Sequence, residues 1–258
     1  MKLDIFLRTH DKGDVHSDKN GRYCGATKFE VIKRCVSSII KSTNNVYNHD
    51  IKITCLDDHS SPDLINVLNN IFEKSIHSNE LIHLEQHGNN ASLLYQLELC
   101  KNSDADLVYL LEDDYLHCET AVEEMLENYE YFKLKLNREI AFHPYDDPDN
   151  YKDRYIDTTR IVLGSKRHWR LNSYSTGTFM VSPSIIRKNY DIYKRMFKFY
   201  MTPYGLSQNI HEGTTINKIW REQVYLFTPI PSVALHMQFE AQRDKFLDWK
   251  SLWDKSIL

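Results

Sequence analysis

The chain has 258 residues, of which 41% are hydrophobic and 26% charged, so it can bury a sizeable core and intrinsic disorder is not expected. Its formal net charge is −4, with 32 basic and 36 acidic residues, and no Lys/Arg block marks one segment as basic. Nucleic acid is therefore not an expected partner, because binding to its backbone favours a basic patch. The 5 cysteines are odd in number and show no C-x-x-C spacing, which argues against a disulfide scaffold or a cysteine-rich zinc site.

The first residues begin directly with a strand-like segment. No charged region followed by a long apolar run is visible there, so no secretory signal is expected. The longest apolar stretches, such as 107–111, are too short to span a bilayer. We therefore expect no transmembrane segment and a cytoplasmic, reducing location.

Strands and helices alternate over the first 130 residues or so. The apolar runs predict strands at 3–7, 51–56, 81–84 and 106–111. Helices are predicted between them: Thr27 and Glu30 have capping-box spacing, and Ser61 followed by Pro62 is typical of a helix start. This order predicts parallel strands with right-handed crossovers, and in such sheets ligands bind at the carboxyl ends of the strands.

The second half of the sequence has a different character. Its predicted elements are a hairpin over Gly164-Ser165, a strand at 178–182 with a helix after it, an extended stretch at 224–231 and a short strand at 232–236. The acidic run at 146–149 lacks the Gly and the terminal Glu of an EF-hand and is expected to be a polar loop. No linker divides the two parts, so a single α/β domain over 1–258 is predicted.

Three adjacent carboxylates, Glu112, Asp113 and Asp114, directly follow the strand predicted at 106–111. They repel one another, so gathering them at a strand end costs free energy unless a cation binds there. Mg²⁺ or Mn²⁺ would suit, because both take oxygen ligands and commonly share them with substrate phosphates. The alternative is a solvated acidic loop before a helix, where carboxylates are stabilising. The buried strand directly before the triplet favours the cation site.

Polar residues also end the first two predicted strands. Asp57 and Asp58 follow the strand at 51–56, where a carboxylate can accept a hydrogen bond from a base or a ribose hydroxyl. An Asx-turn or N-cap role is the alternative for this pair. Arg8 and Thr9 end the first strand, where an arginine can reach a phosphate or stack on a base, unless it lies in an exposed loop.

Together these motifs resemble a known family. The segment 56–63, L-D-D-H-S-S-P-D, resembles the V-D-D-x-S-x-D segment of family 2-like GT-A glycosyltransferases. The segment 110–114 resembles their D-x-D motif, in the E-D-D form of the N-acetylglucosaminyltransferase I family, and 87–91 is loosely similar to their N-x-G-x-x-x-A-x-N stretch. The first strand, however, ends R-T-H-D rather than the commoner P-x-Y/N-N.

The resemblance covers residues 3 to about 125 and implies a GT-A (Rossmann-like) fold. In that fold a central, mostly parallel sheet is flanked by helices. It implies a nucleotide-sugar-binding half over 1–130 and a mixed acceptor-side half over 131–258.

Roles for individual residues follow from the resemblance. Asp58 or Asp57 would contact the base, Asp113 the ribose or the metal, and Asp114 would ligate a Mn²⁺ or Mg²⁺ ion that bridges the donor diphosphate. The donor-binding residues implied in this way are Arg8, Thr9, Asp57, Asp58, Asn90, Glu112, Asp113, Thr176 and Gly177.

The later half adds three weaker matches. The segment 231–236 resembles a P-S-L-x-x-H segment, which implies that His236 joins Asp114 as a metal ligand; the alternative is an ordinary core or surface histidine. The segment 174–180 resembles the one that lines the donor sugar, where Thr176 and Gly177 would allow close approach, unless it is an ordinary turn. Glu212 is the candidate general base for the acceptor hydroxyl, or else a first-turn acidic residue of a helix.

The sequence thus predicts a metal-dependent glycosyltransferase that moves one sugar, with inversion, from a UDP- or GDP-sugar to a glycan, glycolipid or protein acceptor. The Q-x-x-R-W box of processive members is absent, which favours single-sugar transfer. The alternatives are a metal-dependent sugar nucleotidyltransferase and a catalytically inactive carbohydrate- or nucleotide-binding module. No G-x-x-x-x-G-K-[ST] loop occurs, and no G-x-G-x-x-G follows the first strand, so kinase and dehydrogenase functions are poor fits.

Overall fold

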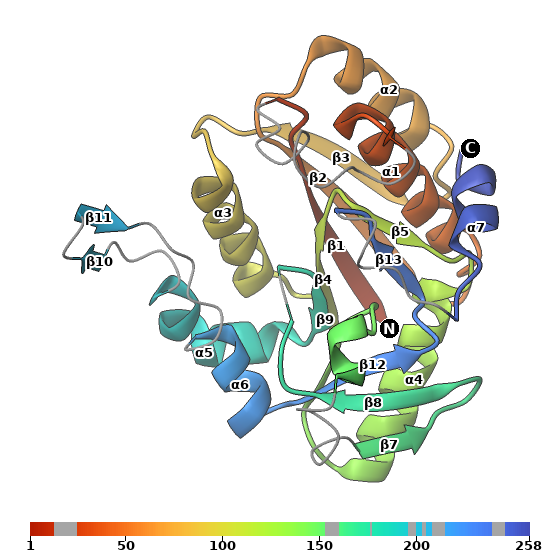
Figure 1. Cartoon of the computed structure of the whole chain (residues 1–258), viewed down its shortest axis with the longest axis vertical. Helices are drawn as coiled ribbons and strands as arrows, with labels where there is room; N and C mark the ends of the chain where they lie inside the picture. Colours follow the sequence, from red (N-terminus) through yellow and green to blue (C-terminus); the bar gives the residue numbers. More distant parts are fainter. Residues whose placement is uncertain are drawn as a thin grey trace.

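A mixed nine-stranded sheet forms the centre of the molecule, in the order β3-β2-β1-β4-β9-β6-β12-β8-β7 (Figure 1). The structure is a computed structural model, and it describes residues 1–12, 25–152, 160–175, 177–195, 200–202, 205–207, 215–238 and 246–258.

The strands of this sheet are β1 Lys2–Thr9, β2 Asp50–Asp57, β3 Ser78–His83, β4 Leu107–Glu112, β6 Ile140–Phe142, β7 Arg160–Leu163, β8 His168–Asn172, β9 Phe179–Val181 and β12 Tyr225–Ile230. The helices are α1 Lys28–Asn44, α2 Pro62–Phe72, α3 Asn89–Asn102, α4 Ala121–Leu136, α5 Pro183–Arg195, α6 Ile216–Glu222, α7 Trp249–Lys255 and the 3-10 helix η2 Pro148–Tyr151. Two short strand pairs complete the fold: β5 Tyr115–His117 with β13 Ala234–His236, and β10 Tyr200–Thr202 with β11 Gly205–Ser207.

The parallel half of the sheet confirms the alternation predicted from the sequence. Strands β3, β2, β1 and β4 are neighbours and are all parallel. The next strand, β9, runs antiparallel to β4, so the sheet becomes mixed where the second half of the chain enters it. The observed architecture is therefore the predicted α/β sheet, mostly parallel at one side and mixed at the other.

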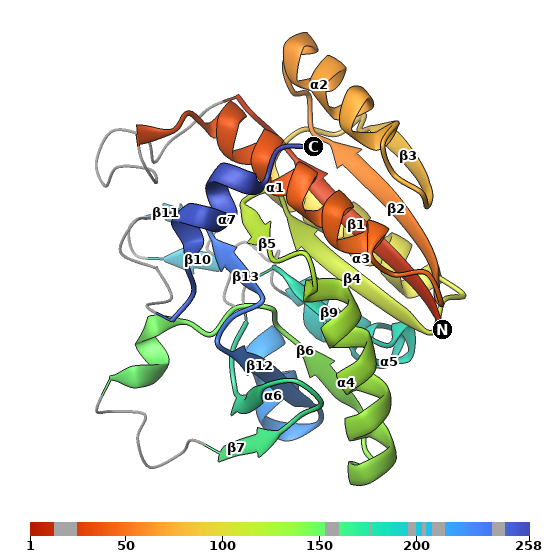
Figure 2. The same ribbon diagram turned by 90° about the vertical axis from the view of Figure 1, so that its right-hand side faces the viewer.

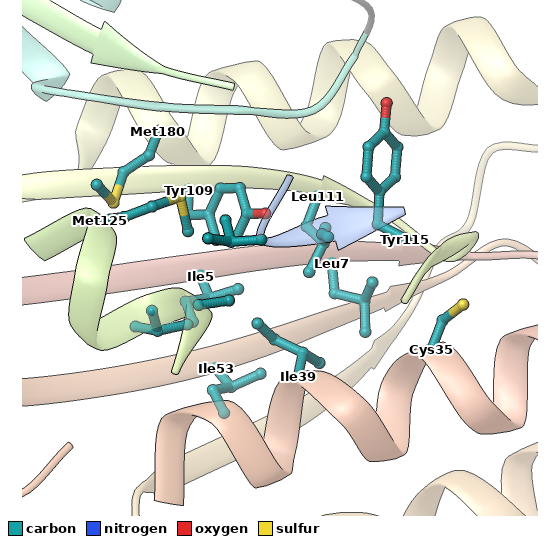
Figure 3. Close-up of a cluster of buried hydrophobic side chains, with 14 of the residues drawn as sticks. Ile5, Leu7, Cys35, Ile39, Ile53, Tyr109, Leu111, Tyr115, Met125 and Met180 are labelled. Atoms are coloured by element: carbon teal, nitrogen blue, oxygen red, sulfur yellow. The ribbon is translucent and has the colours of Figure 1, made fainter. Parts of the chain in front are cut away.

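Helices cover both faces of the sheet (Figures 1 and 2). Because side chains alternate along a strand, Ile5 and Leu7 of β1 enter the core under α1, α2 and α4, whereas Phe6 enters the core under α3, α5 and α6. Figure 3 shows Ile39 of α1 directed at the β1 side chains in the first of these cores. The two cores hold β1 between layers of apolar side chains and so set the position of its carboxyl end.

Both predicted helix starts are confirmed. Thr27 Oγ1 accepts a hydrogen bond from Glu30 N at 3.2 Å, and Ser61 Oγ accepts one from Leu64 N at 3.3 Å. These side chains satisfy backbone N–H groups that have no partner inside the helix. The Glu30 carboxylate of the predicted capping box binds Arg34 Nε one turn later, at 2.7 Å.

The hairpin predicted over Gly164-Ser165 is confirmed as β7 and β8, with Gly164 N donating to Arg167 O at 2.9 Å. Any side chain at position 164 would overlap its neighbours, because a Cβ there would lie 2.2 Å from Asn128 Oδ1 and 2.4 Å from Trp169 Nε1. Glycine at position 164 therefore allows the turn of the hairpin to pack directly against α4.

The acidic run at 146–149 differs from the predicted polar loop. Asp146 is only 2% exposed, and its carboxylate accepts hydrogen bonds from Arg170 Nε at 2.9 Å and Asn150 Nδ2 at 2.8 Å. The partner arginine lies 24 residues later on β8, a contact that no local sequence pattern indicates. Asp146 therefore ties this loop to β8.

Four of the five cysteines lie in the part of the chain that the structure describes. Cys35, Cys55 and Cys100 are buried, Cys118 is half-buried, and none of these four is in a disulfide. Cys24 lies outside the described residues. Within the described ranges, none of the helices combines the length and apolar character needed to cross a bilayer.

Arg167 connects α4 to the segment that leads into β13. Its guanidinium binds Glu124 in a two-point contact, with Nε to Oε2 at 2.5 Å and Nη2 to Oε1 at 2.8 Å, and donates to Pro231 O at 2.5 Å. Burial alone would raise the pKa of Glu124, but hydrogen bonds from Arg167 and Thr120 lower it. This ion pair therefore fixes the chain five residues before His236.

Arg167→Met is expected to destabilise the protein by about 2–4 kcal/mol, because it leaves the buried Glu124 carboxylate without its cation. Lys166→Met is the matched control: the Lys166 side chain is 46% exposed and pairs with Glu123 and Glu127, whose side chains are 40% and 38% exposed, and such surface pairs contribute ~0–1 kcal/mol. Urea denaturation at pH 7 measures both free energies of unfolding. Equal losses in the two variants would contradict the structural role of Arg167.

The loss of stability in Arg167→Met should depend on pH. The folded-state pKa of Glu124 lies below its ordinary value, so its contribution is present above the unfolded pKa of about 4.3 and is lost as the pH falls through the folded value. Without Arg167, burial raises the pKa of Glu124 in the variant, so the difference in unfolding free energy between the native protein and Arg167→Met should be largest at neutral pH and shrink as the pH falls through that raised pKa.

Candidate functional site

The carboxyl ends of β1, β2 and β4 open into a cleft of about 190 Å³ that also meets the starts of α1 and α3. Two larger surface hollows, of about 720 and 550 Å³, lie near Met1 and α4 and beside β3. We place the candidate site in the smaller cleft because opposite charges converge there. The residues that line it are Arg8, Thr9, His10, Lys28, Asp58, Asn89, Ser92, Glu112, Asp113 and Asp114.

Arg8 and Glu112 form an ion pair across the paired ends of β1 and β4. Arg8 Nη2 lies 3.0 Å from Glu112 Oε1, and Nη1 donates to Asn89 Oδ1 at 2.7 Å and to Ser92 Oγ at 3.2 Å. Burial raises the pKa of Glu112, while Arg8 opposes this shift. Arg8 is 8% exposed, so its guanidinium ties β1, β4 and α3 together at the base of the cleft.

Asp113 occupies the turn between β4 and β5 and is oriented by the end of β1. Its Oδ2 accepts a hydrogen bond from His10 N at 2.9 Å. Burial, together with the neighbouring Asp114 carboxylate, raises the pKa of Asp113 to about 7, although Lys28 at the start of α1 opposes the shift. Asp113 therefore exchanges between its neutral and ionised forms near neutral pH, chiefly because it is buried.

Asp114 meets His236, which is 122 residues away in the sequence. His236 Nε2 lies 3.2 Å from Asp114 Oδ2, because β13 pairs antiparallel with β5 and puts His236 opposite Tyr115. The Tyr115 ring stacks on the imidazole at 4.8 Å between centroids. Burial alone would lower the pKa of His236, but the carboxylates of Asp114, Glu112 and Asp147 raise it.

These two residues fit a divalent cation. A carboxylate oxygen and an imidazole nitrogen already face each other, and stacking on Tyr115 fixes the orientation of the ring. An imidazole ligand suits Mn²⁺ better than Mg²⁺, which prefers oxygen ligands alone. The nearby Asp113 carboxylate would supply a further oxygen ligand.

Asp57 and Asp58 follow the same strand but have different surroundings. Asp57 is 2% exposed, and its Oδ1 accepts from Ser60 N at 3.1 Å, which is the turn-forming role given above as the alternative. Asp58 lines the cleft. Burial alone would raise the pKa of Asp58, but hydrogen bonds from His87, His59 and Gly88 N lower it. Only Asp58 of this pair is placed to meet a ligand in the cleft.

The segment before β9 approaches the acidic triplet closely. A Cβ on Gly177 would lie 3.0 Å from the Glu112 carboxylate, and Thr178 Oγ1 accepts from Glu112 N at 3.1 Å. Gly177 therefore lies against the Glu112 carboxylate, and its expected contact with a donor sugar stays a prediction. Thr176 and the candidate base Glu212 lie outside the described residues.

The structure also shows which cleft residues the sequence interpretation missed. Asn90 is on α3 but is not among the residues that line the cleft; the preceding Asn89 is, because the two side chains leave the helix in different directions. Lys28 and His10 also line the cleft. A lysine at the first position of a helix that starts beside two strand ends is the one signal that could have indicated Lys28.

No protein-family model matches the sequence, and no curated protein matches it. Solved structures do resemble the fold. A structure of S. aureus TarS 1-349 is similar over 88% of this chain and 60% of that chain, with a TM-score of 0.52 and 12% identity. A second S. aureus TarS structure is similar over 88% of this chain and 36% of that chain, with a TM-score of 0.51 and 11% identity. The mannosyltransferase PcManGT from Pyrobaculum calidifontis, in complex with GDP-Man and Mn²⁺, is similar over 88% of this chain and 56% of its own. Its TM-score is 0.47 and its identity 11%.

The chain therefore spans 60% of the shorter TarS chain and about a third of the longer one, and it shares their fold. The shared fold has the mostly parallel sheet and flanking helices that the sequence predicts. At 11–12% identity the likeness shows the fold and not the substrate.

Asp113→Asn is expected to stabilise the metal-free protein by about 1 kcal/mol, because it removes one of three crowded carboxylates. This corresponds to a rise of about 2–4 °C in Tm, measured by calorimetry in EDTA at pH 8. Asp104→Asn, a change at a fully exposed carboxylate 86% accessible to solvent, should leave Tm nearly unchanged. A lower Tm for Asp113→Asn in EDTA would show that the triplet is not under electrostatic strain.

Proposed function

We propose that the protein is a metal-dependent glycosyltransferase that moves one sugar from a nucleoside-diphosphate sugar to an acceptor hydroxyl, with inversion. The observation that carries the proposal is the contact of Asp114 with His236 at a strand-end cleft that Asp58, Lys28 and Arg8 also border. The glycosyltransferase fold shared with TarS supports the reaction class. The donor, a UDP- or GDP-sugar, and the acceptor, a glycan, glycolipid or protein hydroxyl, are part of the proposal, as is a cytoplasmic location.

The donor would span the cleft from Asp58 to Asp114. Asp58 is 4% exposed and ionised, so it can accept a hydrogen bond from a base N–H at the β2 end. Lys28 lies at the amino end of α1, where its ammonium and the helix dipole both favour the negative diphosphate. The Arg8–Glu112 pair is engaged by protein groups, so its role is to hold the strand ends in place.

A Mn²⁺ or Mg²⁺ ion bound by Asp114 and His236 would neutralise charge on the leaving diphosphate. Asp113, next to that pair, would orient the ribose or complete the ligand set. Glu212 is proposed to take the proton of the acceptor hydroxyl as the hydroxyl oxygen attacks the anomeric carbon and the bond to the diphosphate breaks. The stacking of Tyr115 on His236 keeps the imidazole nitrogen directed at Asp114 throughout.

Asp114→Asn is expected to lower transfer and donor hydrolysis at least about 100-fold in Mn²⁺ while the fold survives, because the variant loses a charged cation ligand. A panel of UDP- and GDP-sugars, with and without Mn²⁺, measures the released nucleoside diphosphate, and circular dichroism measures the fold. Undiminished turnover in the variant would refute the proposed metal role.

The released product distinguishes a glycosyltransferase from the alternative, a sugar nucleotidyltransferase. With a sugar 1-phosphate and a nucleoside triphosphate, a nucleotidyltransferase would release pyrophosphate, whereas a glycosyltransferase would release nucleoside diphosphate from the finished donor only. Metal-independent donor binding without turnover would instead support an inactive binding module.

Asp58→Ala is expected to raise the donor KM about 10-fold or more with a smaller effect on kcat, because a base contact contributes equally in the ground and transition states. Asp63→Ala is the control, since Asp63 lies on the same segment, is exposed and does not line the cleft. Initial rates over a range of donor concentrations give both constants. A loss confined to kcat would count against the base contact.

A further inference from the structure

Three side chains at the β2 end of the cleft, Asp58, His59 and His87, converge on one point. Their potential ligand atoms all lie within 4.8 Å of one another. His87 Nδ1 lies 2.7 Å from Asp58 Oδ1, and His59 Nδ1 lies 3.1 Å from the same oxygen. Two imidazole nitrogens therefore face a single carboxylate oxygen.

The carboxylate is held in place by its surroundings. Asp58 Oδ2 accepts a hydrogen bond from Gly88 N at 2.9 Å, which leaves Oδ1 for the two imidazoles. His10 Nδ1 lies 2.6 Å from the Asp58 carbonyl oxygen, so the backbone at this position is tied to the end of β1 as well. Metal-binding carboxylates are commonly oriented by such secondary hydrogen bonds.

The two imidazoles come from different loops and are open to solvent. His59 follows β2, has a φ of 60° and is 43% exposed; His87 precedes α3 and is 65% exposed. A left-handed conformation is uncommon for a residue other than glycine, and here it directs the ring to Asp58. The ring centroids of His59 and His87 are 4.8 Å apart, with the ring planes tilted by 55°. An ion can reach the nitrogens from solvent, and water can complete its ligand shell.

We propose that Asp58, His59 and His87 form a site for a transition-metal ion such as Zn²⁺, separate from the Asp114–His236 site. Two imidazoles and one carboxylate are ligands that Zn²⁺ and Co²⁺ accept in tetrahedral geometry, whereas Mg²⁺ favours oxygen ligands. Zn–N distances are about 2.0–2.1 Å, so small rotations of the exposed rings would draw the ligands together. The ion would take the place of the two N–H donors that now share Asp58 Oδ1.

The site has a consequence for donor binding, and this part rests on the proposed function. Asp58 is the proposed contact for the nucleotide base, and a bound Zn²⁺ ion would occupy that carboxylate. Zn²⁺ at this site therefore inhibits donor binding, while Mn²⁺ at Asp114 and His236 supports catalysis.

The test uses the full chain after removal of metal with a chelator. Zn²⁺ affinity is measured by competition with a chromogenic chelator, and the visible spectrum of bound Co²⁺ reports its coordination geometry. His87→Ala and His59→Ala should each weaken Zn²⁺ binding at least about 10-fold and abolish the tetrahedral Co²⁺ spectrum. His83→Ala is the matched control, because His83 Nδ1 also contacts an aspartate, Asp57 Oδ2, at 3.0 Å and is 62% exposed.

A second variant separates the two metal sites. The double variant Asp114→Asn, His236→Ala should keep the Zn²⁺ affinity and the Co²⁺ spectrum, because the histidine site is intact. Equal Zn²⁺ binding by His87→Ala and His83→Ala would overturn the site, and so would loss of Zn²⁺ binding in the double variant.

The inhibitory part is tested by titrating UDP and GDP with and without one equivalent of Zn²⁺. Zn²⁺ should raise the apparent Kd of the binding nucleotide at least about 10-fold in the native protein and not in His87→Ala. An unchanged Kd with Zn²⁺ bound would overturn the inhibition. If neither nucleotide binds while Zn²⁺ still binds through His59 and His87, the proposed function fails and the metal site stands.

Discussion

The hydrogen-bond register of β1 with its two parallel neighbours determines which side chains meet at the cleft. Arg8 lies opposite Glu112 of β4, and Thr9 lies opposite Asp57 of β2. A slip of one residue would turn Arg8 away from Glu112 and exchange the layers into which Ile5 and Phe6 pack. Because both layers are buried, such a slip would expose or crowd apolar side chains on both faces, so the cores protect the geometry of the polar ends.

Each of the three crowded carboxylates of the acidic triplet has its own partner. Glu112 pairs with Arg8, Asp113 accepts a hydrogen bond from the backbone of His10, and Asp114 faces His236. Only the first of these partners is a permanent cation, so the negative charge of the cleft is centred on the turn between β4 and β5. This division of roles among adjacent residues explains why a strand end can carry three acidic side chains in a row and remain folded.

Apolar runs were sufficient to predict β1, β2 and β4, because each is six to eight residues long and mostly buried. The third strand, β3, is an edge strand with no buried residue, and its polar first half hid its start at Ser78. The three-residue strands β5 and β6 are too short to show a pattern, and their places depend on partners far along the chain. The same limit applies to the site. The strand-end carboxylates were predictable as a group. Which of Asp57 and Asp58 lines the cleft depends on the turn at Ser60, whose backbone N–H binds Asp57. Which of Asn89 and Asn90 lines the cleft depends on the rotation of α3 about its axis.

The pairing of β5 with β13 joins residues 122 positions apart, and this has a consequence for biosynthesis. During translation, β1, β2 and β4 emerge before β13, so the histidine that faces Asp114 joins the fold after the parallel strands. A polypeptide that ends before β13 would keep the residues of the parallel sheet but lack His236, so Asp114 would face no imidazole.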